Sequence, residues 1–301
     1  MSVLSEDRDI SGTALRNPLL DKALASLGKL PPFSPVLNRV LASLNQDNST
    51  YAQLGELIEK DTVLAANILQ LANSALYARS GNSTSVRHAA ARLGMSKLMN
   101  AILGMSIARM WNQGQMPQSW SVGRFNVHSV ATALLSDLIA QRRAVAYPEG
   151  AFVAGLLHDI GQLLIVRSIP AEYTRVAELS ESTGRPPLEC EMEILGFTHA
   201  ELSARALATW NLPEPTQVAV RYHHSPELDP SRLKPGEVPL SAVLDAANRY
   251  TNSIGISTLP VEPSESGDTA PMEALGLDAT VQEKLLREFR AEYSAMEQFF
   301  R

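Results

Sequence analysis

The sequence predicts an all-α fold. Apolar residues recur at helical spacing along most of the 301 residues, and no segment alternates apolar and polar residues over the length of a strand. Helix-capping signatures precede several of these periodic stretches, and Gly94 and Pro213 follow two of them. The composition, with 45% hydrophobic and 19% charged residues, is typical of a globular protein large enough for two domains.

In the first half of the chain, the predicted helices begin at recognisable caps. Ser34 provides an N-cap followed by Pro35 at the first helical position. Residues 50–53 (TYAQ) form a capping box, and Asp61 can cap a helix over residues 62–77. These caps predict three consecutive helices before residue 78.

Residues 85–110 superficially resemble a helix-turn-helix, with Gly94 in the left-handed position between the helices. The second helix, from Lys97 to Met110, is apolar on nearly all sides, whereas a recognition helix presents polar side chains to base edges. The pattern therefore favours a core helix, and binding of nucleic acid through residues 79–124 is the weaker interpretation.

Residues 114–123 are rich in Gly, Pro and Ser and mark a boundary, so we expect four parts in the chain. These are a flexible tail (1–15), an N-terminal helical subdomain (16–115), a second helical subdomain (116–256), and an exposed loop with a C-terminal helix (257–301). Predicted helices after the boundary cover residues 125–142, 148–169, 173–183, 198–210, 214–224 and 241–254. Capping boxes precede the 198–210 helix, at residues 198–201, and the terminal helix, at residues 280–283.

The charge is distributed unevenly around a net value of -6. From Thr62 to Ser136 there is no Asp or Glu, although six Lys and Arg residues occur. The preferred interpretation is that this basic segment docks on the acidic remainder of the chain. The alternative is a site for an anionic partner, whose residues would be Arg79, Arg87, Arg92 and Lys97.

The chain carries no features of a secreted or membrane protein. Its polar, acidic N-terminus does not resemble a signal peptide, and its apolar stretches are shorter than the roughly 20 residues of a membrane helix. The single cysteine, Cys190, cannot form an internal disulfide. We therefore expect a cytoplasmic protein without a membrane partner.

Seven titratable residues lie on predicted helices of the second subdomain and form a candidate cluster. Buried imidazoles and carboxylates are costly unless they are paired or share a metal, and together they suit Fe, Mn, Zn or Ni. A helical bundle can bring such ligands to one point. The residues are His128, His158, Asp159, His199, His223, His224 and Asp245.

The order of His128, the adjacent pair His158-Asp159, and Asp245 resembles the HD superfamily of metal-dependent phosphohydrolases. Within it, "GLLHDIGQLLI", "ILGFTHAELSARALATWNLP" and "VRYHH" resemble both the HD-GYP phosphodiesterases and the HDOD (HD-related output) domains. Upstream, "LPPFSPVLNRVLASLNQDNSTYAQLGELIEKDTVLAANILQLANSALYA" and "SVRHAAARLGMSKLMNAIL" resemble the N-terminal part of HDOD domains. The resemblance covers about residues 25–255.

The resemblance implies an N-terminal helical bundle packed on a C-terminal HD-like helical domain. It also implies that His128, His158, Asp159 and Asp245 are the core metal ligands. The remaining members of the candidate cluster would serve a second metal.

Two departures from the HD-GYP pattern argue against catalysis. Gln162 stands where those enzymes carry lysine, and residues 223–227 (HHSPE) lack the GYP signature. Glutamine cannot supply the positive charge that would stabilise a phosphoryl transition state. We therefore assign no catalytic residue.

Two hypotheses remain from the sequence. The preferred one is a bacterial-type signal-transduction output module that acts by protein–protein interaction with signalling proteins. Its cluster would hold a structural metal or form a buried polar network. The alternative is a metal-dependent phosphodiesterase or phosphohydrolase acting on a nucleotide or cyclic dinucleotide. The sequence leaves the partner and the oligomeric state open.

Overall fold

The computed structural model describes residues 17–30, 33–43, 51–78, 82–111, 116–117 and 120–300. Across these ranges the chain forms helices and turns, and its β-structure is limited to one isolated bridge between Val145 and Val238. The predicted all-α fold is confirmed. The predicted tail (1–15) and Thr50, the first residue of a predicted capping box, lie outside the described residues.

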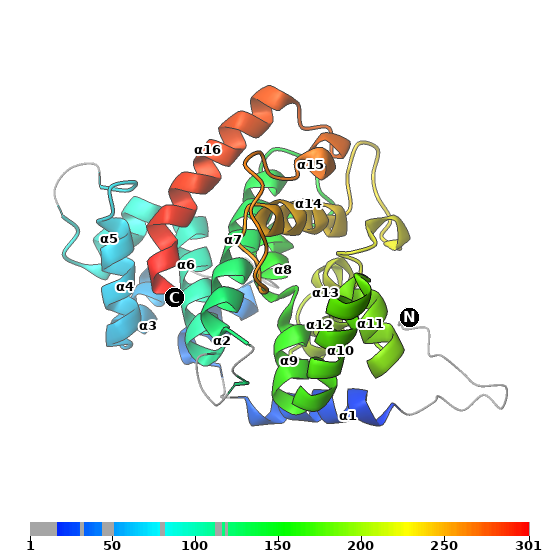
Figure 1. Cartoon of the computed structure of the whole chain (residues 1–301). Helices are drawn as coiled ribbons and strands as arrows, with labels where there is room; N and C mark the ends of the chain where they lie inside the picture. The colour runs from blue at the N-terminus through cyan, green and yellow to red at the C-terminus, as the bar shows by residue number, and fades with distance from the viewer. Residues whose placement is uncertain are drawn as a thin grey trace.

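In the N-terminal half three helices, α2, α4 and α5, pack against α6, while α3 packs against α2, α4 and α5 (Figure 1). Ser34 and Asp61 cap α2 and α4 as predicted, because their side chains accept from the backbone N–H groups of Leu37 at 3.2 Å and Leu64 at 3.1 Å. The elements are α2 (Pro35–Ser43), α3 (Tyr51–Glu59), α4 (Thr62–Ala72), α5 (Val86–Leu93) and α6 (Met95–Trp111). The predicted end of α4 at Tyr77 was wrong, since residues 73–77 form turns.

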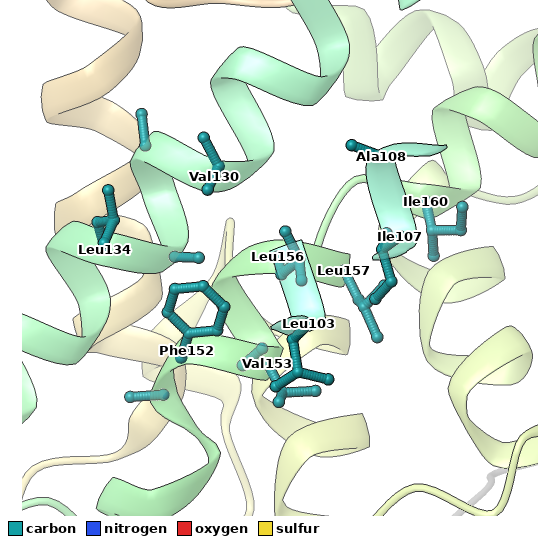
Figure 2. Close-up of a cluster of buried hydrophobic side chains, with 14 of the residues drawn as sticks. Leu103, Ile107, Ala108, Val130, Leu134, Phe152, Val153, Leu156, Leu157 and Ile160 are labelled. Carbon is teal, nitrogen blue, oxygen red and sulfur yellow. The ribbon is translucent and has the colours of Figure 1, made fainter. Parts of the chain in front are cut away.

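Helix α6 is buried on most sides and contributes to one core that joins the two halves. Figure 2 shows Leu103 and Ile107 of α6 near Leu156 and Leu157 of the second half. The prediction that this helix packs in the core is confirmed. Gly94, which links α5 to α6, has a positive φ of 81° as expected, but its ψ of 164° lies outside the left-handed helical region.

The C-terminal half is built on α7, which packs against α8 and α14, while α12 packs against α9 and α13. The predicted helix 148–169 was wrong as a single element, because His158 and Asp159 form a turn between α8 and α9. Helix α11 was not predicted, and α10 begins at residue 170 instead of 173. The elements are α7 (Val122–Ala140), η2 (Pro148–Gly150), α8 (Ala151–Leu157), α9 (Ile160–Ser168), α10 (Pro170–Thr183), α11 (Pro187–Leu195), α12 (His199–Thr209), α13 (Glu214–Arg221), η3 (Pro226–Leu228) and α14 (Leu240–Ser253).

Residues 148–168 include the apolar segment that contains α8 and α9. Taken as one helix, this segment is long and apolar enough to cross a membrane, but 89% of its most apolar window is buried inside the protein. Such burial is what the central helices of a helical core show.

The two ends of the described chain connect the halves. Helix α1 (Pro18–Ala25), followed by η1 (Ser26–Lys29), packs on α9 and α12 of the C-terminal half, although it lies at the start of the described chain. After the short α15 (Ala270–Ala274), helix α16 (Ala279–Met296) and η4 (Glu297–Phe299) run from the side of α14 to the N-terminal half (Figure 1). Asp278 caps α16, so the capping box expected at residues 280–283 was wrong. The subdomain boundaries stay a prediction.

Candidate metal centre

Two glycines allow the helices that carry the candidate cluster to approach closely. A Cβ atom on Gly155 of α8 would lie 2.5 Å from the Cα atom of Ala133 in α7. A Cβ atom on Gly161 of α9 would lie 2.0 Å from the carbonyl oxygen of His199 at the start of α12. The α7–α8 and α9–α12 contacts therefore depend on glycine, and they bring His128 of α7 and His199 of α12 to the turn at His158 and Asp159.

On one side of this turn, His128 and His158 face each other and one carboxylate oxygen. Their Nε2 atoms are 3.3 Å apart, and they lie 3.6 and 3.3 Å from Oδ2 of Asp159. Each Nδ1 atom lies 2.8 Å from a backbone carbonyl oxygen, that of Ile256 for His128 and that of Gly155 for His158. All three titratable side chains are buried.

On the other side, three histidines face the second carboxylate oxygen of Asp159. Oδ1 lies 3.2 Å from Nε2 of His199 and 3.6 Å from Nε2 of His223. The Nε2 atoms of His199 and His224 are 3.0 Å apart, and the ring of His224 lies beside that of His223. His223 places its Nδ1 atom 2.7 Å from the carbonyl oxygen of Val220.

Glu191 of α11 holds His199 and was not among the predicted site residues. Its carboxylate accepts from the backbone N–H of His199 at 2.7 Å and lies 2.9 Å from the ring Nδ1 atom. Glu191 is buried with Cys190 and Leu195 on one face of α11. That apolar face was the only signal in the sequence, and it was missed because α11 itself was not predicted.

The hydrogen bonds determine which ring nitrogens are free. A carbonyl oxygen can only accept, so the Nδ1 atoms of His128, His158 and His223 must carry the hydrogen. In the neutral rings each Nε2 atom then presents a lone pair, and two facing lone pairs cannot form a hydrogen bond. Oδ1 of Asp159 and Nε2 of His223 are buried without a hydrogen-bond partner in the described part of the chain. Such a set of acceptors calls for a shared cation.

The carboxylate at the centre of the cluster is held in its charged form. Burial raises the pKa of Asp159, but positive charge at His158 and hydrogen bonds donated by the rings of His128, His158 and His199 outweigh burial and keep this pKa well below its usual range. Neutral rings with Nε2 lone pairs would not lower this pKa, so the effect requires positive charge between the rings, from protons or from a bound cation. A charged carboxylate with histidines around both oxygens can bridge two cations.

The histidines on the Oδ1 side differ in pKa. Burial lowers the pKa of His199, but the charges of Glu191 and Asp159 and their hydrogen bonds raise it to about 10. Burial lowers the pKa of His223 to about 4, and burial followed by the neighbouring histidines lowers that of His224. His199 is therefore the histidine on this side that takes up a proton, and its Nε2 atom faces the Nε2 lone pair of His224.

Six of the seven predicted site residues thus come together, in two groups that share Asp159. One group is His128, His158 and Asp159, and the other is Asp159, His199, His223 and His224, with the candidate ligand atoms of each group within 4.8 Å of one another. Asp245 belongs to neither group among the described residues. Its carboxylate lies 3.9 Å from the guanidinium of Arg249 on the same helix, α14.

Two of the four residues predicted for an anionic partner, Arg92 and Lys97, are engaged within the chain. Lys97 forms an ion pair with Glu292 of α16, and Arg92 donates to the carbonyl oxygen of Ala72 at 3.2 Å. Arg87 is exposed, and Arg79 lies outside the described residues. The Lys97 ion pair agrees with docking of the basic segment on the acidic part of the chain, and the anionic partner stays a prediction.

A cavity of about 710 Å³ opens beside the Oδ1 side of the cluster. Its inner end is formed by Asp159, His199 and His224, together with Glu191. Gln162 also lines it. The remaining walls come from α10, α11 and residues 257–261, with Ile165 of α9 and Asn248 and Asn252 of α14.

Comparison with solved structures supports this architecture. An HDOD domain protein of unknown function from Geobacter sulfurreducens is similar with a TM-score of 0.75 at 23% identity, covering 93% of this chain and 98% of that one. A Marinobacter aquaeolei VT8 protein, named provisionally as a signal transduction protein, has a TM-score of 0.69 at 24% identity and coverages of 94% and 65%. A Shewanella amazonensis SB2B protein, named provisionally as a phosphohydrolase, has a TM-score of 0.68 at 21% identity and coverages of 93% and 98%. At these identities the similarity shows the fold.

Comparison at the level of sequence identifies the family. An uncharacterized protein of Treponema pallidum (strain Nichols) is 24% identical over 253 residues, which are 77% of this chain and 47% of that protein. The chain therefore spans about half the length of this curated relative. The family model of the HDOD domain matches residues 30–226, which is more than half of the chain, and the chain therefore belongs to the HDOD family.

Proposed function

We propose that the protein is a signal-transduction output module that holds a divalent transition metal at the His/Asp cluster and acts through contacts with other signalling proteins. The observation that supports the metal most strongly is the arrangement of the imidazoles. Each of His128, His158 and His223 uses its Nδ1 atom for a backbone carbonyl and turns its Nε2 atom toward Asp159. The proposal includes a cytoplasmic location.

The donor set fits such an ion. Buried acceptors without hydrogen-bond partners, at Asp159 and His223, are satisfied by a cation, and imidazole with carboxylate suits Fe, Mn, Zn or Ni. His128, His158 and Asp159 would hold one ion, and the three remaining histidines with Asp159 would hold a second. A bound ion would supply Lewis acidity toward an oxygen ligand. Glu191 and the backbone carbonyls hold the rings in the orientation that this requires.

Phosphate ester hydrolysis is the second candidate function. The cavity that reaches His199 and His224 favours it, and so does the provisional name of the Shewanella neighbour. Its lining contains Gln162 and, among the described residues, no Lys or Arg. The described lining therefore offers no cationic side chain that would neutralise charge developing on a phosphoryl group, which favours the non-catalytic role.

Elemental analysis combined with a hydrolysis assay tests both candidates. We expect one or two transition metal ions per chain, a loss of metal in His158→Ala, and no loss in the control His88→Ala, since His88 is exposed and outside the cluster. We expect no hydrolysis of bis-(p-nitrophenyl) phosphate above background with added Mn²⁺, Fe²⁺, Zn²⁺ or Ni²⁺. Metal-dependent turnover that Asp159→Ala abolishes would instead establish the phosphohydrolase. Absence of metal from a natively folded protein would contradict the metal centre.

A further inference from the structure

The cavity beside the cluster combines a polar inner end with apolar walls. Tyr173, Val176 and Ala177 of α10 line one wall, and Leu188 and Leu195 of α11 line another. Its volume of about 710 Å³ falls within the range of roughly 300–1,000 Å³ typical of small-molecule sites. The space is therefore suited to a small molecule with a substantial apolar part.

The charges of the lining disfavour a ligand with several phosphates. Asp159, Glu181 and Glu191 contribute carboxylates to the lining, and the described lining residues include no Lys or Arg. Cations at the cluster could balance one anionic group at the inner end. A second anionic group farther out would meet Glu181 and no lining cation, so a cyclic dinucleotide or a nucleoside diphosphate is a poor match.

The mouth of the cavity exposes apolar side chains that a ligand would cover. Leu259 and Val261 line the cavity and are 41% and 50% exposed to solvent. The backbone here is held by Arg124 of α7, which donates to the carbonyl oxygens of Ser257 at 3.3 Å and Leu259 at 2.8 Å. Because Arg124 fixes the backbone at residues 257 and 259, the exposed side chains of Leu259 and Val261 can contact an apolar ligand at little entropic cost.

We propose that this cavity binds an amphipathic molecule with one anionic head group and an apolar chain. The head lies at the inner end, toward His199 and His224, and the chain lies between α10, α11 and residues 257–261. The contact between the head and a cation rests on the proposed function. The contact of the chain with the walls does not depend on it.

Isothermal titration calorimetry with hexanoate, octanoate and decanoate, below their micelle concentrations, tests the apolar walls. Each methylene buried in the cavity is expected to raise the affinity about threefold to fourfold. Decyl phosphate in a parallel titration distinguishes a phosphate head from a carboxylate head. Adenosine monophosphate and cyclic diguanylate serve as comparison ligands and are expected to bind more weakly than decanoate.

Two variants, Ala177→Trp and Leu188→Gln, test whether the ligand binds in this cavity. Ala177→Trp fills the space at an exposed lining position of α10 and is expected to weaken decanoate binding at least about tenfold, since it removes buried chain contacts. Ala171→Trp, on the same helix and also exposed but outside the lining, is the matched control and should bind as the wild type does. Leu188→Gln makes a separate wall polar and should also weaken binding.

The proposal is overturned if affinity does not change with chain length, if Ala177→Trp and Leu188→Gln bind decanoate as tightly as Ala171→Trp, or if cyclic diguanylate binds more tightly than decanoate. Measuring the metal content of the same samples distinguishes failure of the cavity proposal from failure of the proposed metal centre. Metal-loaded protein that binds no alkyl ligand would refute the cavity proposal alone. If the purified, folded protein contains no metal but binds decanoate, the absence of metal would contradict the metal centre, and the binding would support the contact of the chain with the apolar walls.

Discussion

Replacing Glu191 by glutamine tests whether the cluster is organised to hold a metal. The Glu191 side chain is 9% exposed, accepts from the His199 backbone N–H at 2.7 Å, and lies 2.9 Å from the ring Nδ1 atom of His199. Glutamine can keep one accepted hydrogen bond but not the charge that polarises the ring. Loss of such a partner typically weakens metal affinity about tenfold to a hundredfold, which corresponds to about 1.4–2.7 kcal/mol.

Metal affinity of Glu191→Gln is measured by competition with a chromophoric chelator, and stoichiometry by elemental analysis after dialysis at limiting metal. Glu189→Gln is the matched control, because Glu189 lies on the same helix, is exposed, and pairs with Arg185 on the surface at 3.3 Å. We expect metal to be lost from the group that contains His199 and retained by His128 and His158. An affinity for Glu191→Gln within about twofold of the wild type, well below the expected loss, would refute the reasoning.

Two further predictions concern stability. Gly161→Ala is expected to destabilise the fold by about 2–4 kcal/mol, because its Cβ atom would overlap the His199 carbonyl oxygen, whereas Gly28→Ala, with open space around it, should be nearly neutral in urea denaturation; equal effects would contradict the close α9–α12 contact. Burial, with Asp268 and Glu227 nearby and Arg249 only partly compensating, raises the pKa of Asp245 to about 6. The folded protein therefore binds more protons than the unfolded chain between about pH 4 and pH 6, so this group's contribution to stability falls as pH rises through that range, by about 1–2 kcal/mol after allowance for solvent screening. Asp245→Asn should remove this dependence and leave the metal content unchanged; a tenfold loss of metal affinity would instead identify Asp245 as a ligand.

The candidate cluster shows what a sequence pattern can predict without a structure. The order of His128, His158, Asp159, His199 and the pair at residues 223–224 is readable from the sequence, because each of these titratable residues lies within or at the end of a segment with helical apolar spacing. Their convergence follows from the packing of α7, α9, α12 and α13 around one core. The sequence could therefore predict which residues form the cluster, while its division around the two oxygens of Asp159 depends on the fold.

The break between α8 and α9 could not be predicted from hydropathy. Both helices are buried, so apolar residues continue on both sides of His158 and Asp159 and the hydropathy pattern alone is that of a single helix. The turn at His158 and Asp159 is defined by contacts with other helices, at Gly155 against α7 and at Gly161 against α12. Tertiary contacts thus override the local helical pattern and turn the Asp159 side chain away from capping α9 and toward the histidines.

The charge of the cluster relates its metal content to its function. Asp159 and Glu191 contribute two negative charges, while the five imidazoles of the cluster are neutral when they bind a metal. The pKa of about 10 for His199 indicates that this excess negative charge attracts one proton. One divalent cation in place of that proton makes the cluster neutral and leaves little attraction for an anionic ester. Two cations leave it positive next to a cavity without lining Lys or Arg, so the ions alone would attract the anion. The number of ions per chain therefore determines whether the cluster can attract an anionic ester, and the hydrolysis assay determines whether it cleaves one.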